Sequence, residues 1–217
     1  VHDFCATDLS AFYFDIRKDA LYCDASDSVT RRATRTVMEH LFTTLTAWLA
    51  PILVFTAEEA WQEWKRMGGT GEESVHLRNY PALPAAWASP ELLARWEKLR
   101  AIRSVITGEL EKAREAKVIG ASVQAAPVVF VAPEHKPVVD GVDLAELAIT
   151  ASLSLATAAP ADAFTLPDVP GVAVKVEVSG GEKCERCWKV LPEVGKSTAH
   201  PTLCIRCESV VAIAEAA

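Results

Sequence analysis

Four cysteines near the end of the chain have the type and spacing of a metal site. They form two C-x2-C pairs, Cys184 with Cys187 and Cys204 with Cys207, and sixteen residues separate the pairs. A gap of roughly 15–20 residues is typical of a four-cysteine zinc site. Four thiolates at about 2.3 Å complete a tetrahedral shell and leave no position for a water. The pattern therefore predicts one structural Zn²⁺.

Other uses of these cysteines fit the sequence less well. Disulfides would suit a small secreted module, and nothing here suggests secretion. A thioredoxin-like C-x-x-C needs a βαβ context and would not occur twice. An iron–sulfur cluster remains an alternative, because four thiolates can also bind iron. His200 could replace a cysteine, but the four cysteines already complete the shell.

Length and composition narrow the class of protein. The chain has 217 residues, half of them hydrophobic, which allows one or two packed domains plus a small metal module. It has no run of about 18 apolar residues and no signal-peptide pattern at its start, so we expect no membrane partner. The remaining cysteines, Cys5 and Cys23, are expected to be buried thiols in a reducing, cytoplasmic protein. Since helix-like sequence begins at once, we expect a fragment of something larger.

Charge is unevenly distributed along the chain. The formal net charge of −7 argues weakly against binding to nucleic acid. However, residues 118–182 carry two basic and eight acidic side chains, whereas residues 95–117 carry seven basic and four acidic ones. A nucleic acid could therefore still approach a face outside the acidic block.

The first half of the sequence has the apolar periodicity of amphipathic helices. Asp27 or Ser28 can cap the second helix, and Thr56 to Glu59 has the pattern of a capping box for the third. Ser89-Pro90-Glu91 opens a long fourth helix. The expected helices are residues 3–22, 28–49, 56–66 and 90–117.

Three arginines crowd the first turns of the second helix, where positive charge opposes the helix dipole. They are Arg31, Arg32 and Arg35. They either form an ordinary solvated face, paired with Asp24 and Asp27, or contact phosphate. The sequence leaves both interpretations open.

The pattern changes to a mixed one after Gly120. Residues 124–132 and 172–178 are β-like, 149–157 could add a strand, and 133–147 could hold one or two short helices. No phosphate-binding glycine loop, nucleophile elbow or catalytic constellation is present, and the five histidines are scattered. We therefore expect a protein that acts through interaction surfaces.

The residues around the first cysteine pair suggest one such surface. Trp188 follows Cys187, Arg186 lies inside the knuckle, and Lys183 and Lys189 flank it. An exposed ring among cations suits a nucleobase, since base stacking contributes roughly 1–3 kcal/mol. Alternatively, Trp188 packs on a neighbouring domain and forms the small core of the knuckle.

Several stretches, in order, resemble class I aminoacyl-tRNA synthetases of the isoleucine type. Residues 3–24, DFCATDLSAFYFDIRKDALYCD, look like the start of the anticodon-binding helical bundle, and HLRNYP resembles that family's extended linker. Residues 110–125 look like the end of its long helix and the entry to a β-containing junction domain. The cysteine-rich tail resembles the zinc finger that the family shares with some DNA glycosylases.

The resemblance implies a mainly α fold with three parts. These are an anticodon-binding helical bundle over residues 1–119 that includes the long helix 90–117, a small α+β junction domain over 120–180, and a four-cysteine zinc-knuckle module over 181–217. The family's catalytic signatures and editing stretches do not occur, so this chain by itself is not expected to be an enzyme. The parent would be an ATP-dependent ligase that joins isoleucine to its tRNA.

The same resemblance implies that the chain, as a monomer, binds the anticodon arm of isoleucine tRNA and docks on the catalytic body of its parent. The residues expected to contact tRNA lie on the zinc module and at the end of the long helix: Lys183, Arg186, Trp188, Lys189, Arg206, Arg114 and Lys117. The alternative is a structural or protein-interaction tail capped by zinc. A glycosylase would need a catalytic N-terminal Pro-Glu, which Val1-His2 does not supply.

Overall fold

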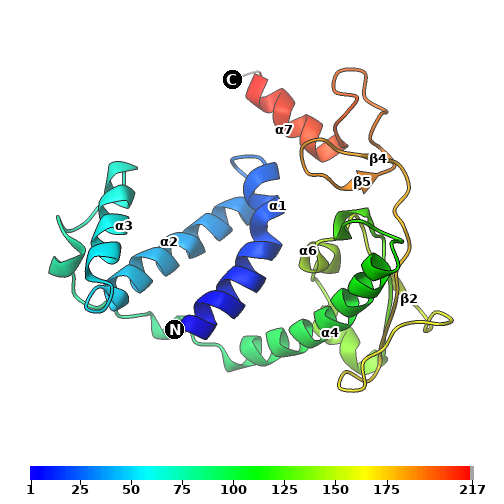
Figure 1. The fold of residues 1–217 in the computed structure, drawn as a ribbon, viewed down its shortest axis with the longest axis horizontal. Helices are drawn as coiled ribbons and strands as arrows, with labels where there is room; N and C mark the ends of the chain where they lie inside the picture. Colours follow the sequence, from blue (N-terminus) through cyan, green and yellow to red (C-terminus); the bar gives the residue numbers. More distant parts are fainter. Residues whose placement is uncertain (216–217) are drawn as a thin grey trace. The chain divides into compact units, whose positions relative to one another are not determined.

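The computed structural model describes residues 1–215 and is mainly helical, as the sequence predicts (Figure 1). The helices are η1 (Phe4–Phe14, a π-helix), α1 (Asp15–Cys23), α2 (Val29–Leu49), α3 (Val54–Arg66), α4 (Pro90–Glu115), α5 (Lys136–Val139), α6 (Leu144–Ala148) and α7 (Ile205–Glu215). The strands are β1 (Val128–Val131), β2 (Ser154–Ala156), β3 (Val172–Lys175), β4 (Glu182–Lys183) and β5 (Val190–Leu191). Single 3₁₀ turns occur at Val75–Leu77, Ala85–Trp87, Ser122–Gln124 and Pro133–His135.

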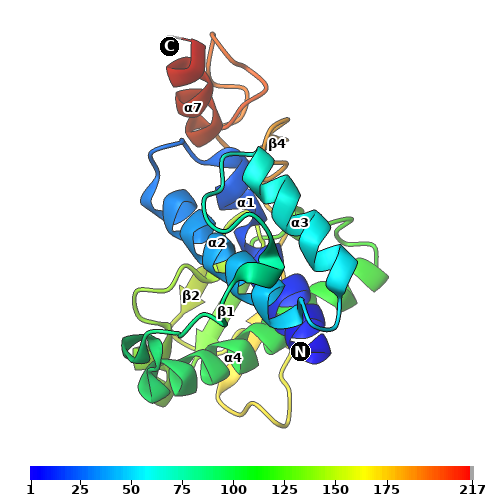
Figure 2. The ribbon, with the colours of Figure 1, turned by 90° about the vertical axis from the view of Figure 1, so that its left-hand side faces the viewer.

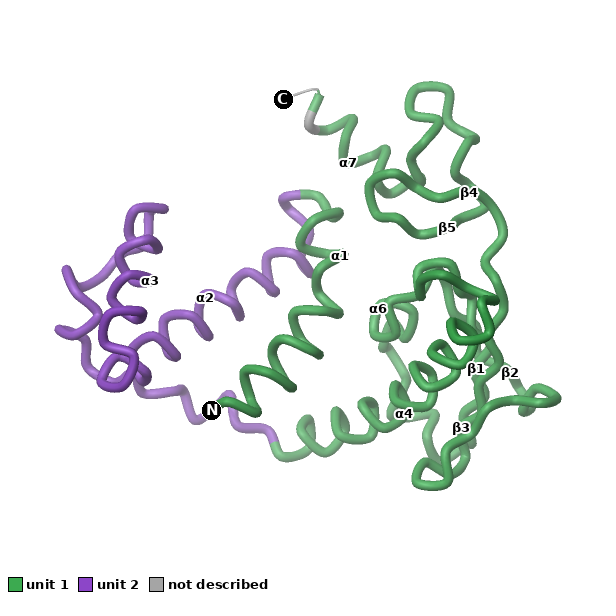
Figure 3. Tube along the Cα trace, viewed as in Figure 1, with its two compact units in different colours: residues 1–25, 90–217 green, residues 26–89 purple. Residues whose placement is uncertain are grey.

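The chain divides into two compact units, which Figure 3 distinguishes by colour. Unit 1 combines Val1–Ala25 with Pro90–Ala217, and unit 2 is the continuous segment Ser26–Ser89. The expected functional division into bundle, junction domain and zinc module stays a prediction.

The core of unit 1 lies between α4 and a small sheet. Strand order is β2-β1-β3, with β2 parallel and β3 antiparallel to β1. The apolar stripe of α4, including Ile102 and Ile106, is buried together with Val129 and Val174 of the sheet. Removing such side chains from water stabilises the fold by about 1.5–3 kcal/mol each.

Helices α1 and α6 meet at one end of this core. Arg17 Nη1 lies 2.7 Å from Glu146 Oε1 in a partly buried ion pair, and Ile16 of α1 is buried in the same cluster as Leu147 of α6. This packing fixes α1 beside the second half of the chain, although more than a hundred residues separate them in sequence.

Unit 2 is built on α2 and α3, which lie side by side in both views (Figures 1 and 2). Its buried centre is Trp61, whose indole Nε1 donates to the Glu72 carbonyl at 3.0 Å. Ser28 caps α2 as predicted, since its hydroxyl accepts from the Arg31 amide.

The predicted capping box in unit 2 is wrong. Helix α3 begins at Val54, two residues before Thr56, so this threonine is not its cap. The following loop uses Glu58 instead: its Oε2 accepts from Ser74 Oγ at 2.8 Å and from the Val75 amide at 2.9 Å. The Glu58 carboxylate therefore stabilises the loop after α3, whereas the capping-box pattern assigns its neighbour Glu59 to the helix start.

The remaining predicted elements are found with shorter bounds. The long helix 90–117 ends at Glu115, and the β-like stretches form short strands around β1 and β3. None of the helices in residues 1–215 combines the length and apolar composition needed to span a bilayer.

Candidate metal centre and nucleic-acid interface

The first cysteine pair is carried by a tight hairpin between β4 and β5. The Cys184 amide donates to the Lys189 carbonyl and the Trp188 amide donates to the Cys184 carbonyl, both at 2.9 Å. At the hairpin's start, Gly181 has φ +104°, and a Cβ there would overlap the backbone of Leu191. Only glycine fits such a close approach without displacement. The second pair lies at the start of α7.

The four cysteine sulfurs converge. The Sγ atoms of Cys184, Cys187, Cys204 and Cys207 all lie within 4.8 Å of one another, with three of the four residues buried. A tetrahedral shell with Zn–S bonds of about 2.3 Å has sulfur–sulfur edges of about 3.8 Å. The Cys187 and Cys204 sulfurs are 3.8 Å apart. The cluster therefore fits one structural zinc ion, whose binding would hold the hairpin and α7 together. Within residues 1–215, His200 is outside this cluster and lies 3.6 Å from Glu215.

Two thiols of the cluster, those of Cys187 and Cys207, resist ionisation by themselves. A shared hydrogen bond with Cys207, together with burial, raises the pKa of Cys187 to about 12. The pKa of Cys207 is also raised to about 12: the bond with Cys187 lowers it, but the bond with Cys23 and burial outweigh that effect. Thiolates are the ligands of zinc, so metal binding must displace these protons.

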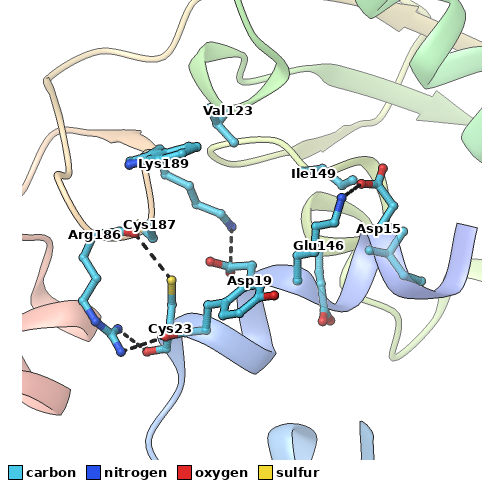
Figure 4. A pocket seen from close by; sticks show the side chains of 13 residues that line it. Asp15, Asp19, Cys23, Val123, Glu146, Ile149, Arg186, Cys187 and Lys189 are labelled. Atoms are coloured by element: carbon cyan, nitrogen blue, oxygen red, sulfur yellow. Dashed lines mark hydrogen bonds and ion pairs between the residues drawn. The ribbon is translucent and has the colours of Figure 1, made fainter. Parts of the chain in front are cut away.

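A bidentate ion pair fixes the module to the end of α1. Arg206 Nη1 and Nη2 each donate to a carboxylate oxygen of Asp19, both at 2.7 Å. Lys189 Nζ approaches the same carboxylate at 3.8 Å (Figure 4). Burial acts to raise the pKa of Asp19, but the hydrogen bonds and charge of Arg206, with Lys189, hold it below its ordinary value. Two of the predicted tRNA contacts are thus engaged within the protein.

Arg186 also points toward α1. Its guanidinium donates to the carbonyls of Tyr22 and Cys23, and its Nη1 lies 3.7 Å from Cys207 Sγ. Cys23, buried at 5 % exposure, in turn donates to the Arg186 carbonyl at 3.8 Å (Figure 4). These reciprocal bonds join the knuckle to the helix end. Sequence reasoning expects Cys23 only as a buried thiol, since no local pattern pairs it with a residue 163 positions away.

Trp188 is a predicted contact that remains accessible. It is 62 % exposed and has φ +67°, a left-handed conformation that turns the chain sharply after Cys187. Lys183 Nζ lies 5.3 Å from the ring centroid, within the range of a cation–π contact. The ring therefore presents its surface to solvent beside a positive charge.

A cavity of about 410 Å³ opens between α1, the knuckle and the loop around Val123 and Ile149. The surface of the cavity is mostly apolar, and Trp188, Tyr22 and Glu146 are among the residues that line it. Figure 4 shows how the knuckle and α1 form opposite walls. The cavity is large enough for a planar heterocycle.

The two predicted contacts from α4 are not brought to this cavity. Arg114, near the end of α4, is ion-paired with Glu111 at 2.5 Å on the exposed helix surface. Lys117 follows the helix with φ +56°, and its exposed side chain is not among the cavity lining. The structure therefore separates the predicted residues into a zinc-module group and a helix-end group.

Comparison with known families agrees with this arrangement. Residues 1–129 match the model described as the anticodon-binding domain of tRNA ligase, and residues 181–210 match the zinc finger found in FPG and IleRS. The chain therefore belongs to the anticodon-binding domain family of tRNA ligases. Within that family it carries the zinc finger at the position of the converging cysteines.

The similar curated proteins are isoleucine–tRNA ligases. The chain is 51 % identical over 212 residues to that of Gluconobacter oxydans, covering 97 % of this chain and 21 % of that protein. It is 50 % identical to that of Ruegeria pomeroyi, covering 96 % and 21 %, and 49 % identical to that of Mesorhizobium japonicum, covering 94 % and 21 %. The resemblance to isoleucine-type synthetases is confirmed, and the chain spans about a fifth of the length of these relatives.

Proposed function

We propose that this chain recognises the anticodon arm of isoleucine tRNA as part of an isoleucine–tRNA ligase. The observation that carries the proposal is Trp188, an exposed ring beside Lys183 on a module fixed to α1. A base unstacked from an anticodon loop can stack on such a ring, with a contribution of about 1–3 kcal/mol. The parent's ATP-dependent charging of tRNA with isoleucine is part of the same proposal.

The cavity beside Trp188 supports recognition of an unpaired base. Its walls are held by the Asp19–Arg206 pair and by Arg186, so the site is organised before RNA arrives. A preformed site loses less conformational entropy on binding. Arg186 and Lys189 act in this proposal as positioning residues, and their direct contact with RNA is secondary. Arg114 and Lys117 are proposed as contacts to the RNA backbone.

The test compares Trp188→Ala and Trp188→Phe in the 217-residue chain. Each variant is titrated with isoleucine tRNA and with a tRNA of another anticodon. We expect the alanine variant to lose about 5- to 100-fold in affinity for the isoleucine tRNA, and the phenylalanine variant to retain most of it. Equal, weak binding of both tRNAs by the unmodified chain would contradict the proposal that this chain by itself recognises the anticodon.

A second candidate function is a structural or protein-interaction tail without a direct RNA role. It is favoured by the engagement of Arg186, Lys189 and Arg206 with α1. Under this alternative, Trp188→Ala changes thermal stability in the full-length parent but leaves charging of isoleucine tRNA unchanged. Lost charging at unchanged stability favours the RNA role.

Further proposals concern the metal ligands, the oligomeric state and location, and the domain boundaries. We propose that Cys184, Cys187, Cys204 and Cys207 are the ligands of the zinc ion. We also propose a monomer in the cytoplasm, with the catalytic body of the parent as an intramolecular partner. The proposed functional boundaries are a bundle to residue 119, a junction domain to 180 and the zinc module after it.

A further inference from the structure

Unit 2 contains a basic depression that the proposed anticodon site does not use. It has a volume of about 450 Å³ and lies between the first half of α2 and the end of α3. Its lining side chains are mostly polar or charged on the α2 side and include the two arginines, Arg32 and Arg35. The opposite wall is formed by Trp64, Met67 and the turn at Gly68-Gly69.

The two guanidinium groups are exposed and unneutralised. Neither Arg32 nor Arg35 makes an ion pair within residues 1–215, although Glu39 lies one turn from Arg35 on the same rim. Arg32 lies in the first turn of α2, where a positive charge opposes the helix dipole at a cost of about 0.3–1 kcal/mol. Two exposed arginines without an ion pair, one of them at an unfavourable helix end, are a local conflict of the kind expected at a binding site.

The opposite wall of the depression is centred on a packed aromatic ring. The Trp64 ring is 4.6 Å from the ring of buried Trp61 and 6.0 Å from that of Phe42. It covers Gly69 so closely that any Cβ there would overlap the indole. Packed aromatic rings therefore form part of the wall that the arginines face.

We infer that this depression binds the phosphate backbone of RNA, through Arg32 and Arg35, as a sequence-independent contact. Guanidinium groups match the geometry of phosphate oxygens, and each neutralised phosphate adds salt-dependent affinity. This inference rests on the proposed binding of tRNA and adds a second contact to it, in a different unit of the chain. Of the two interpretations that the sequence leaves open for these arginines, an ordinary solvated face or a phosphate contact, the inference favours the phosphate contact.

The experiment measures the salt dependence of tRNA binding. The double variant Arg32→Ala/Arg35→Ala is compared with the unmodified chain from 50 to 300 mM salt, about the range in which phosphate contacts dominate affinity. We expect the slope of log K against log salt to fall in magnitude by about 1–2 and the affinity to fall about tenfold near 0.1 M salt. The loss should be the same for isoleucine tRNA and for a tRNA of another anticodon.

Two further variants separate charge from folding. Arg66→Ala is the matched control, because it removes an arginine of α3 that is already paired with Glu63 at 2.6 Å, and it should leave the slope unchanged. Glu39→Gln removes the negative charge on the rim and should strengthen binding about two- to threefold, an effect that a damaged fold could not produce. Circular dichroism confirms that each variant is folded.

The outcomes also distinguish this inference from the anticodon proposal. If the double variant binds with the unmodified slope while Trp188→Ala loses affinity, the phosphate site is wrong and the anticodon site stands. If the chain shows no preference among tRNAs but the double variant still has a smaller salt-dependence slope, the anticodon proposal is wrong and the phosphate site stands. A short oligouridylate serves as second probe, and failure of the unmodified chain to bind either RNA overturns the inference.

Discussion

Arg206 of the zinc module and Asp19 of α1 form a two-point ion pair across 187 residues of sequence, with both N–O distances at 2.7 Å. Asp24 extends the pair, since one of its carboxylate oxygens lies 3.3 Å from the same guanidinium. A planar guanidinium facing a carboxylate in this way is the strongest form of such a pair, because both bonds are charge-assisted. The pair holds the end of α1 against the metal module.

The first prediction concerns this pair. Asp19→Asn should lower the free energy of unfolding at neutral pH by about 1–2 kcal/mol, after allowance for partial solvent screening at the side chains. Arg206→Lys should cost about half as much, because one ammonium cannot donate along two parallel directions. Urea unfolding followed by tryptophan fluorescence measures both.

The matched control for the first prediction is Asp15→Asn. Asp15 pairs with Lys18 on the exposed surface of the same helix, at 3.0 Å, and exposed pairs contribute about 0–1 kcal/mol. Equal losses for the two asparagine variants would contradict a special role for the Asp19–Arg206 pair.

The second prediction concerns the metal. Elemental analysis of protein purified without chelator should give one zinc per chain, and Cys204→Ser should remove it, while Cys5→Ser, outside the cluster, should not. Because the pKa of Cys187 and of Cys207 is raised to about 12 in the thiol state, protons compete strongly with the metal, and zinc affinity should fall as pH drops. A colorimetric chelator titration from pH 8 to 5 checks the sign. Retention of the fold without bound metal would refute the structural role.

The third prediction concerns Glu58 in unit 2. Burial acts to raise the pKa of Glu58, but bonds from Gln62, Ser74 and the Val75 amide outweigh it and lower the pKa below its ordinary value. A depressed pKa in the folded state adds stability above the unfolded-state pKa, and this stability is lost as pH falls through the folded-state value. Glu58→Gln should therefore cost about 1 kcal/mol at pH 7, with the difference shrinking once the pH falls below the unfolded-state pKa of about 4.3 and disappearing below the folded-state pKa.

Urea unfolding of both proteins at a series of pH values measures that difference. Glu59→Gln is the control, because Glu59 is exposed on the same helix and its substitution should change little at any pH. A stability difference between Glu58→Gln and the unmodified chain that stays constant down to pH 3 would show that the carboxylate charge is not the cause.

The fourth prediction concerns Gly108 in the middle of α4. Alanine there improves helix propensity by about 1 kcal/mol. However, its Cβ would lie 2.8 Å from Phe164 Cε1, and Phe164 is held by two backbone bonds to Val174 at 2.7 and 2.9 Å. Overpacking costs about 1–3 kcal/mol, so Gly108→Ala should be destabilising by about 1 kcal/mol net. In a Phe164→Ala background the same change should become stabilising, and thermal unfolding distinguishes the two signs.

Local signals in the sequence predict most of the helical fold. Ser28 accepts the bond expected of an N-cap, and the Ser89-Pro90-Glu91 start correctly places the long helix. The apolar stripe of α4 is buried as its periodicity indicates, and the cysteine spacing predicts the converging sulfurs. These features succeed because each depends on residues within a few helical turns or, for the cysteines, on two knuckles with a characteristic spacing.

The failures have one physical origin, which is competition from distant partners. Thr56 to Glu59 has the pattern of a capping box but does not start α3, and the Glu58 carboxylate is bonded to a loop sixteen or more positions later. Likewise, the cations predicted to meet RNA include Arg186 and Arg206, whose neutral and acidic partners lie on α1, more than 160 positions earlier. The sequence shows which side chains are basic, but only the fold shows which of them already have hydrogen-bond or ion-pair partners within the protein.

The interruption of unit 1 by a continuous unit 2 has a consequence for the order of events during synthesis. Residues 26–89 form a compact unit of their own. Helix α1 emerges before this unit, yet its partner Arg206 emerges 187 residues after Asp19, which takes at least several seconds at elongation rates of about 5–20 residues per second. Closing so long a loop is entropically costly and slow. Helix α1 therefore precedes unit 2 in the chain but can form its ion pair with Arg206 only after the zinc module has been synthesised.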